Sequence, residues 1–283
     1  MIPAPFDYAR PRSLDEAFAI MAEHGAEAKV LAGGHSLLPM MKLRLATPAM
    51  LIDISRIDGL DGIKASSDSL TIGALTTHAA IAASKEVSKI APALSDAAGQ
   101  IGDAQVRNRG TIGGASAHGD PSADYPAVLL ALGATFTVQS RSGTKTIPAA
   151  GFFQGMFETA LESNAILTAI EIDAAPKSAY VKFPHPASHY AVVGVAAKLK
   201  MEGSRIAEAR IAVTGVGDSV FRPASVEKAL TGVDSSDKGA IEAACVDTAA
   251  GIEGRGDVFA SGNYRRAMAD VYCTRAVIAA ANR

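Results

Sequence analysis

The sequence predicts an α+β protein of two domains, and three observations lead to this prediction. The chain has 283 residues, roughly twice the length of a common domain. Before about residue 174, candidate strands and helices are mixed along the chain. After residue 177, candidate strands come first and candidate helices follow, an order typical of an antiparallel sheet covered by helices on one face. We therefore expect one domain at residues 1–174 and a smaller α+β domain at 175–283.

The first expected helix begins after Ser13 and ends near Gly25. Ser13 and Glu16 have the spacing of a capping box, in which the hydroxyl serves the Glu16 amide and the carboxylate reaches back. Further along, short apolar runs predict strands, and longer runs with helical spacing predict helices. The expected strands are Ala28–Leu31, Met50–Ile54, Leu70–Ala74, a strand-like stretch at Arg107–Gly114, Ala134–Gln139, Thr144–Ile147 and Ile166–Ile172. The expected helices are Leu37–Leu45, one beginning at Thr76, Ile90–Ile101 and Ala127–Leu132, the last after a polar loop that reaches Pro126.

The second domain is expected to begin after the Ala-Ala-Pro-Lys stretch at 174–177. Its predicted strands are Ala179–Phe183, Ala191–Lys200 and Ile206–Val213, and its predicted helices are Pro223–Leu230, Lys238–Gly251 and Asn263–Ala281.

Composition excludes several classes of function. The formal net charge is -2, which argues against a nucleic-acid-binding surface, because such surfaces show a marked basic excess. The two cysteines, Cys245 and Cys273, are too few for a zinc or iron–sulfur site made by this chain alone, and we expect free, partly buried thiols and no metal site. Neither a secretory signal nor an apolar run long enough for a transmembrane helix is recognisable, so a cytoplasmic location is expected.

Two glycine pairs, Gly33-Gly34 and Gly113-Gly114, each follow a strand-like run. Paired glycines allow backbone amides to turn toward one point, which suits an anion, and Ser36 and Thr111 add hydroxyl groups. Neither pair matches the P-loop or the Rossmann glycine fingerprint. Two interpretations remain open at this point: a diphosphate held between two loops by neutral donors, or two tight strand ends without a ligand.

Longer motifs around both pairs resemble a known family. The stretch KVLAGGHSLLPMMKLRLATP at 29–48, the stretch VRNRGTIGG at 106–114 and the stretch DPSADYP at 120–126 are similar to the FAD loops of molybdenum hydroxylase flavoprotein subunits. The likeness is strongest to the medium subunits of aerobic carbon monoxide dehydrogenases, to which MIPAPFDY at 1–8 and IGALTT at 72–77 are also similar. The resemblance extends over nearly the whole chain, and it favours the diphosphate interpretation.

The resemblance implies an FAD-binding domain of the p-cresol methylhydroxylase type, with a small lobe at about 1–55 and a larger lobe at about 56–174, followed by a domain like the C-terminal domain of carbon monoxide dehydrogenase flavoproteins. FAD is expected between the lobes, bound non-covalently. Family positions near the pyrophosphate, the rest of the cofactor and the flavin ring fall on Leu31, Ala32, Gly33, Gly34, His35, Ser36, Leu37, Gly110, Thr111, Ile112, Gly113, Gly114, Ala115, Asp124, Leu167, Lys182 and Tyr190. Ala115 stands where many relatives have Asn, so we expect it to contribute its backbone alone.

Several of these residues also have an interpretation without a cofactor. Asp124 has the sequence context of a helix N-cap, Lys182 that of a solvent-facing strand residue, and Arg107 and Arg109 suit either charge compensation of a diphosphate or a surface contact. His35 stands in a loop where some other flavoenzymes attach the flavin covalently, although the family resembled here does not. The remaining histidines lack ligand spacing, and solvated or structural roles are expected for them.

The sequence shows no catalytic triad and no pair of carboxylates suited to acid–base chemistry, so we expect no catalytic residue in this chain and assign the chemistry to the flavin. The resemblance implies a small [2Fe–2S] subunit and a large molybdopterin subunit as partners, in a dimer of heterotrimers that meets the inner face of the membrane through those partners. Electrons would pass from the clusters through FAD to an external acceptor such as a quinone. The alternatives are a stand-alone FAD oxidase or dehydrogenase acting on an organic substrate, and a non-catalytic assembly subunit.

Overall fold

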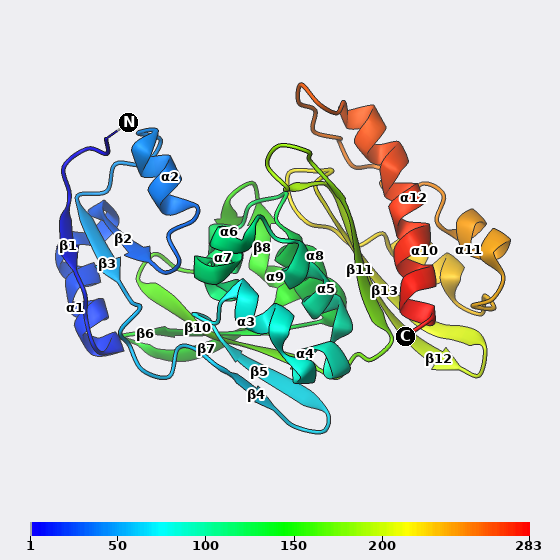
Figure 1. Ribbon diagram of the computed structural model, residues 1–283, viewed down its shortest axis with the longest axis horizontal. Coiled ribbons are helices and arrows are strands. Elements are labelled where there is room, and N and C mark those ends of the chain that lie inside the picture. The colour runs from blue at the N-terminus through cyan, green and yellow to red at the C-terminus, as the bar shows by residue number, and fades with distance from the viewer. Residues whose placement is uncertain (1) are drawn as a thin grey trace.

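Three parts follow one another across the molecule, as the computed structural model shows for residues 2–283 (Figure 1). The N-terminal part (blue) holds a three-stranded sheet, the middle part (cyan to green) holds a five-stranded sheet covered by helices, and the C-terminal part (yellow-green to red) holds a second three-stranded sheet and the last helices. The expected α+β architecture is therefore confirmed.

In the N-terminal part, three short strands form a parallel sheet against one helix. The sheet has the order β1 (Asp7–Ala9), β3 (Met50–Asp53), β2 (Ala28–Leu31). Helix α1 (Leu14–His24) buries Ala17, Phe18 and Met21 against it, and helix α2 (Leu37–Lys42) follows β2. The 3₁₀ turn η1 (Gly25–Glu27) connects α1 to β2.

The expected cap of α1 is present in altered form. Ser13 Oγ accepts from the Glu16 amide at 3.2 Å, as predicted, but the Glu16 carboxylate accepts from the amide of Arg12 at 2.8 Å instead of that of Ser13. The two side chains still satisfy amides at the start of the helix, which is the purpose of the motif.

The middle part is an antiparallel sheet with helices packed on it. The strand order is β4 (Ile63–Ala65), β5 (Ser69–Gly73), β10 (Ala165–Asp173), β6 (Thr135–Ser140), β7 (Gly143–Pro148). The helices are α3 (His78–Ala83), α4 (Lys85–Ile90), α5 (Pro92–Gln100), α6 (Ala104–Arg109), α7 (Ile112–His118), α8 (Asp124–Leu132) and the short α9 (Ala149–Phe152). A small hairpin of β8 (Phe153–Gly155) and β9 (Glu158–Thr159) completes this part.

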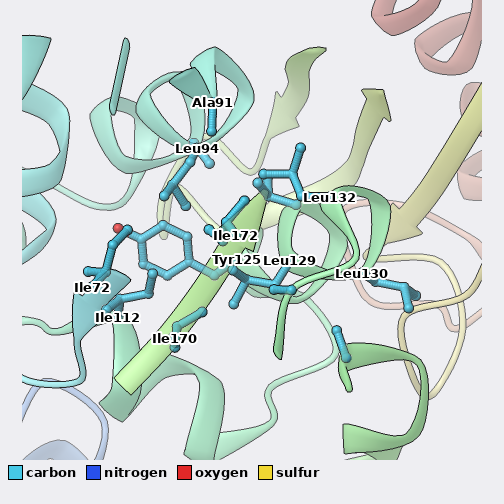
Figure 2. Packing of buried hydrophobic residues seen from close by; sticks show 14 of the residues in the cluster. Ile72, Ala91, Leu94, Ile112, Tyr125, Leu129, Leu130, Leu132, Ile170 and Ile172 are labelled. Atoms are coloured by element: carbon cyan, nitrogen blue, oxygen red, sulfur yellow. The ribbon is translucent and has the colours of Figure 1, made fainter. Parts of the chain in front are cut away.

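Helix α8 lies at the centre of the molecule. Each of its residues is buried, which is expected of a helix that is apolar on every side. Figure 2 shows the ring of Tyr125, from its first turn, among Ile72 and Ile170 of the sheet, Leu94 of α5 and Ile112 of α7. The core of the middle part is therefore built mainly from aliphatic side chains, in keeping with the low aromatic content of 5%.

The C-terminal sheet has the antiparallel order β11 (Ser178–Pro184), β12 (Ala191–Glu202), β13 (Arg205–Thr214). Alternate side chains of its strands face opposite sides. Tyr180, Ala196 and Ala212 join the core around α8, whereas their strand neighbours pack with the C-terminal helices. Both faces are thus covered, not one as the sequence suggested. The helices are α10 (Ala224–Leu230), α11 (Lys238–Ala244) and α12 (Gly262–Ala281).

Some predicted elements were wrong. The stretch Arg107–Gly114 is not a strand: it spans the end of α6 and the start of α7, because Asp103 and Thr111 cap these helices by accepting from the amides of Val106 and Gly114. Helix α8 begins at Asp124 instead of Ala127, α2 ends at Lys42, and α11 ends at Ala244 instead of Gly251. Both thiols are fully buried, not partly.

Candidate functional site

The first glycine loop connects β2 to α2, between the end of a parallel strand and a short helix. Leu31 is the last strand residue and Leu37 the first helical one. Within residues 2–283, the backbone amides from Gly33 to Leu37 donate to no protein acceptor, and the Ser36 hydroxyl makes no capping bond. His35 is exposed. This loop therefore presents free N–H donors, which suit an anionic ligand.

The second glycine loop has a different construction. Gly110 and Thr111 lead into α7, whose first turn contains Ile112, Gly113 and Gly114, followed by Ala115. Its amides are used within the protein: the amide of Ile112 donates to Thr76 O, that of Gly113 to Ala74 O at 2.8 Å, that of Gly114 to Thr111 Oγ1, and that of Ala115 to Thr111 O. The amides from Ile112 to Ala115 are therefore not free to bind a ligand, unlike those of the first loop. The second loop forms a rigid wall of the site instead.

The two loops touch each other through their backbones. A Cβ atom at Gly33 would lie 2.2 Å from the carbonyl oxygen of Arg109 and 2.8 Å from Cα of Gly110, closer than any side chain could fit. A Cβ atom at Gly114 would lie 3.5 Å from Cβ of Ala32. The structure thus brings together the two motifs that the sequence singled out, 77 residues apart by the count from Gly33 to Gly110.

The buried histidine His78 packs against Gly110 of the second loop. His78 is 4% exposed; its amide donates to Gly110 O, and its Nδ1 lies 3.2 Å from the Tyr125 hydroxyl. Burial lowers the pKa of His78 from 6.5 to about 4, and His35 and Arg107 act in the same direction. His78 is therefore a neutral structural residue, as expected for this group of histidines.

Asp124 and Lys182 form one buried ion pair. Lys182 Nζ lies 3.0 Å from Asp124 Oδ2, with side chains 1% and 6% exposed, and Tyr180 donates its hydroxyl to Asp124 Oδ1 at 2.5 Å. Burial raises the pKa of Asp124, while Lys182 and the Tyr180 hydrogen bond oppose the rise. Asp124 is not the helix N-cap, a position that Ala123 occupies, and Lys182 does not face solvent. The interpretation of Asp124 as a helix N-cap and that of Lys182 as a solvent-facing residue are thus both wrong.

Leu167 and Tyr190 belong to two other segments, strand β10 and the turn between β11 and β12. Leu167 is buried beside an irregularity in β10, where Thr168 O accepts from the amide of Ala74, the residue under Gly113. Tyr190 lies in the turn between β11 and β12 and is 40% exposed. Partial burial and the charge of Asp120 raise the pKa of Tyr190, while a hydrogen bond with Ser36 of the first loop opposes the rise.

The residues present fit FAD. The free amides of the first loop suit the diphosphate, the glycine contacts with the second loop leave no side chain in the way, and the guanidinium of Arg107 carries positive charge close to His78. The chain offers no carboxylate in the first loop that would repel the diphosphate.

Comparisons with known proteins agree with an FAD-binding role for this chain. Residues 4–175 match the family described as the FAD binding domain in molybdopterin dehydrogenase, and residues 178–280 match the CO dehydrogenase flavoprotein C-terminal domain. The chain belongs to this family of FAD-binding subunits. It is an FAD-dependent oxidoreductase subunit of the molybdenum hydroxylases, as the resemblance implied.

Individual relatives of this flavoprotein match along almost their whole length. The carbon monoxide dehydrogenase medium chain of Hydrogenophaga pseudoflava is 40% identical, covering 99% of this chain and 98% of that protein. The corresponding chain of Afipia carboxidovorans is 38% identical, covering 98% and 97%. Among solved structures, reconstituted CO dehydrogenase from Oligotropha carboxidovorans superposes with a TM-score of 0.95 at 37% identity, covering 100% of both chains.

Sequence reasoning missed Tyr180, a polar residue of the flavoprotein's site region, and the particular contacts of His78. Tyr180 shares one face of β11 with Lys182, because residues two apart on a strand point the same way, and this spacing next to Lys182 was a usable signal. His78 had no such signal, since its role depends on Tyr125 and Gly110, which lie 47 and 32 residues away in the sequence. In residues 2–283, no helix is long and apolar enough to cross a bilayer.

Proposed function

We propose that this flavoprotein is the medium subunit of an aerobic carbon monoxide dehydrogenase, and that it passes electrons from [2Fe–2S] clusters through FAD to an external acceptor. The observation that carries the proposal is the match to carbon monoxide dehydrogenase medium chains over both domains. The boundary near residue 175 and the two lobes of the FAD domain, at about 1–55 and 56–174, are part of this proposal.

The clusters are assigned to a partner. An iron–sulfur cluster needs several cysteine ligands, whereas Cys245 and Cys273 are the two cysteines of the sequence and both are buried in the C-terminal core. We therefore assign [2Fe–2S] clusters to a small subunit and molybdopterin to a large subunit, assembled as a dimer of heterotrimers. A cytoplasmic enzyme that meets the membrane through these partners and donates to a quinone fits the same scheme.

The chain's own residues bind and orient the cofactor in this scheme. Bound FAD supplies a centre that accepts electrons singly and releases them in pairs. The amides from Gly33 to Leu37 hold the diphosphate non-covalently, the wall from Gly110 to Ala115 fixes its position, and Leu167 and Tyr190 border the flavin. Within this chain no residue is assigned an acid–base role, so substrate chemistry belongs to the large subunit.

The test is flavin reduction in the co-purified complex. We expect a yellow complex whose flavin absorbance bleaches under carbon monoxide, and a yellow isolated chain whose flavin does not bleach. Aldehydes and N-heterocycles serve as parallel substrates, and bleaching by one of these alone would replace carbon monoxide in the proposal. Turnover of an organic substrate by the isolated chain would instead identify a stand-alone oxidase or dehydrogenase, and a chain that binds no flavin would indicate an assembly role.

A further inference from the structure

Lys182 joins three segments that are far apart in the sequence. Its Nζ donates to Gln100 O at 2.7 Å, to Asp124 Oδ2 at 3.0 Å and to His189 O at 2.8 Å. These acceptors lie at the end of α5, at the start of α8 and in the turn between β11 and β12. An ammonium group has three hydrogens, so each is used within the protein.

The turn that Lys182 contacts has an unusual backbone. His189 has φ +60, a left-handed conformation that is uncommon for a residue with a side chain and that persists where the surroundings hold it. Within the turn, His189 N donates to His185 O and His185 N donates to Tyr190 O. These bonds close the turn on itself but do not attach it to the FAD-binding domain.

Few contacts attach this turn to the rest of the site. The amide of Ala191 donates to Ser122 O at 3.2 Å, and Lys182 holds the carbonyl of His189, the residue directly before Tyr190. Tyr190 follows this carbonyl in the chain, and Ser36 of the first glycine loop and Asp120, two residues before Ser122, both influence its pKa. Lys182 therefore holds the turn that carries Tyr190 beside the 120–126 segment and near the loop assigned to the diphosphate.

We infer that Lys182 is a positioning residue for the flavin site: through His189 O it holds the 185–190 turn, and thereby Tyr190, against the first glycine loop. The inference rests on the proposed FAD-binding role of that loop. It also assigns Lys182 an indirect action on the flavin, because the geometry leaves its ammonium no hydrogen for a further acceptor.

The decisive variant removes both charges of the buried pair. Lys182→Met alone would leave Asp124 charged and unpaired in the interior, which destabilises a fold. The double variant Asp124→Asn/Lys182→Met avoids this, since Asn still accepts from the Tyr180 hydroxyl and Met has a similar length to Lys. The matched control is Lys198→Met, because Lys198 Nζ also donates to a helix carbonyl, Leu132 O of α8, at 3.3 Å, but lies away from the turn.

Hydrogen exchange of the full chain is the first measurement. In the double variant, the amides of His185 and of residues 187–190 should exchange about tenfold faster than in the wild type, since loss of one charged hydrogen bond is worth about one decade, while the melting temperature stays near that of the control. Unchanged exchange in 185–190 would overturn the inference. This readout needs no FAD, so it is separate from a failure of the wild type to bind FAD, which would overturn the proposed function.

A double-mutant cycle then tests the route through Tyr190. The rate of FAD dissociation should rise about tenfold in the double variant. The same two substitutions should cause no comparable rise when Tyr190→Ala is already present, because that chain has no tyrosine ring left to position. A full tenfold effect in the Tyr190→Ala background would show that Lys182 acts on the cofactor by another route and would overturn the inference.

Discussion

Replacing Gly33 by alanine tests whether the contact between the two glycine loops matters for FAD binding. The new Cβ would lie 2.2 Å from the carbonyl oxygen of Arg109, whereas non-bonded heavy atoms rest at about 3.5 Å, so the loops must separate by about 1 Å. Overpacking of this kind costs about 1–3 kcal/mol. In the free chain the loops can relax apart, but a cofactor that contacts both loops needs them together, so we expect the strain to appear in binding.

The expected result for Gly33→Ala is an FAD dissociation constant raised by about 5- to 150-fold, the equivalent of that strain. The assay is titration of the FAD-depleted protein, with any subunits that co-purify, followed by flavin fluorescence. Thermal melts without FAD report the fold separately. The matched control is Gly99→Ala in α5, where a Cβ would meet nothing within 4 Å. Alanine is more favourable than glycine in a helix by about 1 kcal/mol.

Two results would contradict this reasoning. Wild-type affinity together with a wild-type melting temperature would show that the close approach at Gly33 can be relieved at no cost. A lowered melting temperature with wild-type affinity would show that the contact stabilises the fold but does not shape the FAD site.

Three further predictions concern the interior. His78 has a pKa of about 4 in the fold against 6.5 as its ordinary value, so its neutral form contributes stability above pH 6.5 that is lost as the pH falls toward 4; urea denaturation should show a fall of about 3 kcal/mol over this range that is absent in His78→Gln. Cys245 and Cys273 are buried and should resist an aromatic disulfide reagent in the native chain, then react after denaturation. Gly113→Ala, whose Cβ would lie 2.4 Å from Cβ of Ala74, should lower the free energy of unfolding by about 1–3 kcal/mol in denaturant titrations.

Each of these predictions has a clear contrary result. An unchanged pH dependence in His78→Gln would show that folding does not lower the pKa of the His78 ring. Rapid labelling of the native thiols would mean that the helices around them open readily. A Gly113→Ala chain as stable as the wild type would show that α7 can move away from Ala74 without loss.

Local patterns in the sequence were sufficient for most elements and for the family. The cap at Ser13, the apolar strands of the C-terminal domain and the two glycine motifs are all short-range signals, and the corresponding elements or matches are observed. The stretch Arg107–Gly114 was misjudged because the β-branched Thr111 and Ile112 favour extended chain, whereas the caps at Asp103 and Thr111 favour helix in the structure.

The sequence by itself determined which hydrogen-bond donors the two loops offer, namely glycine amides and hydroxyl groups. It also determined that the chain has few cysteines and shows no catalytic triad. Only the tertiary structure decided which donors are free. It shows that the amides of the first loop are open while those of the second are engaged with Ala74, Thr76 and Thr111, and that Lys182 is fully occupied by Gln100, Asp124 and His189. The physical reason is that a hydrogen-bond partner distant in the chain is set by packing, which a local pattern does not encode.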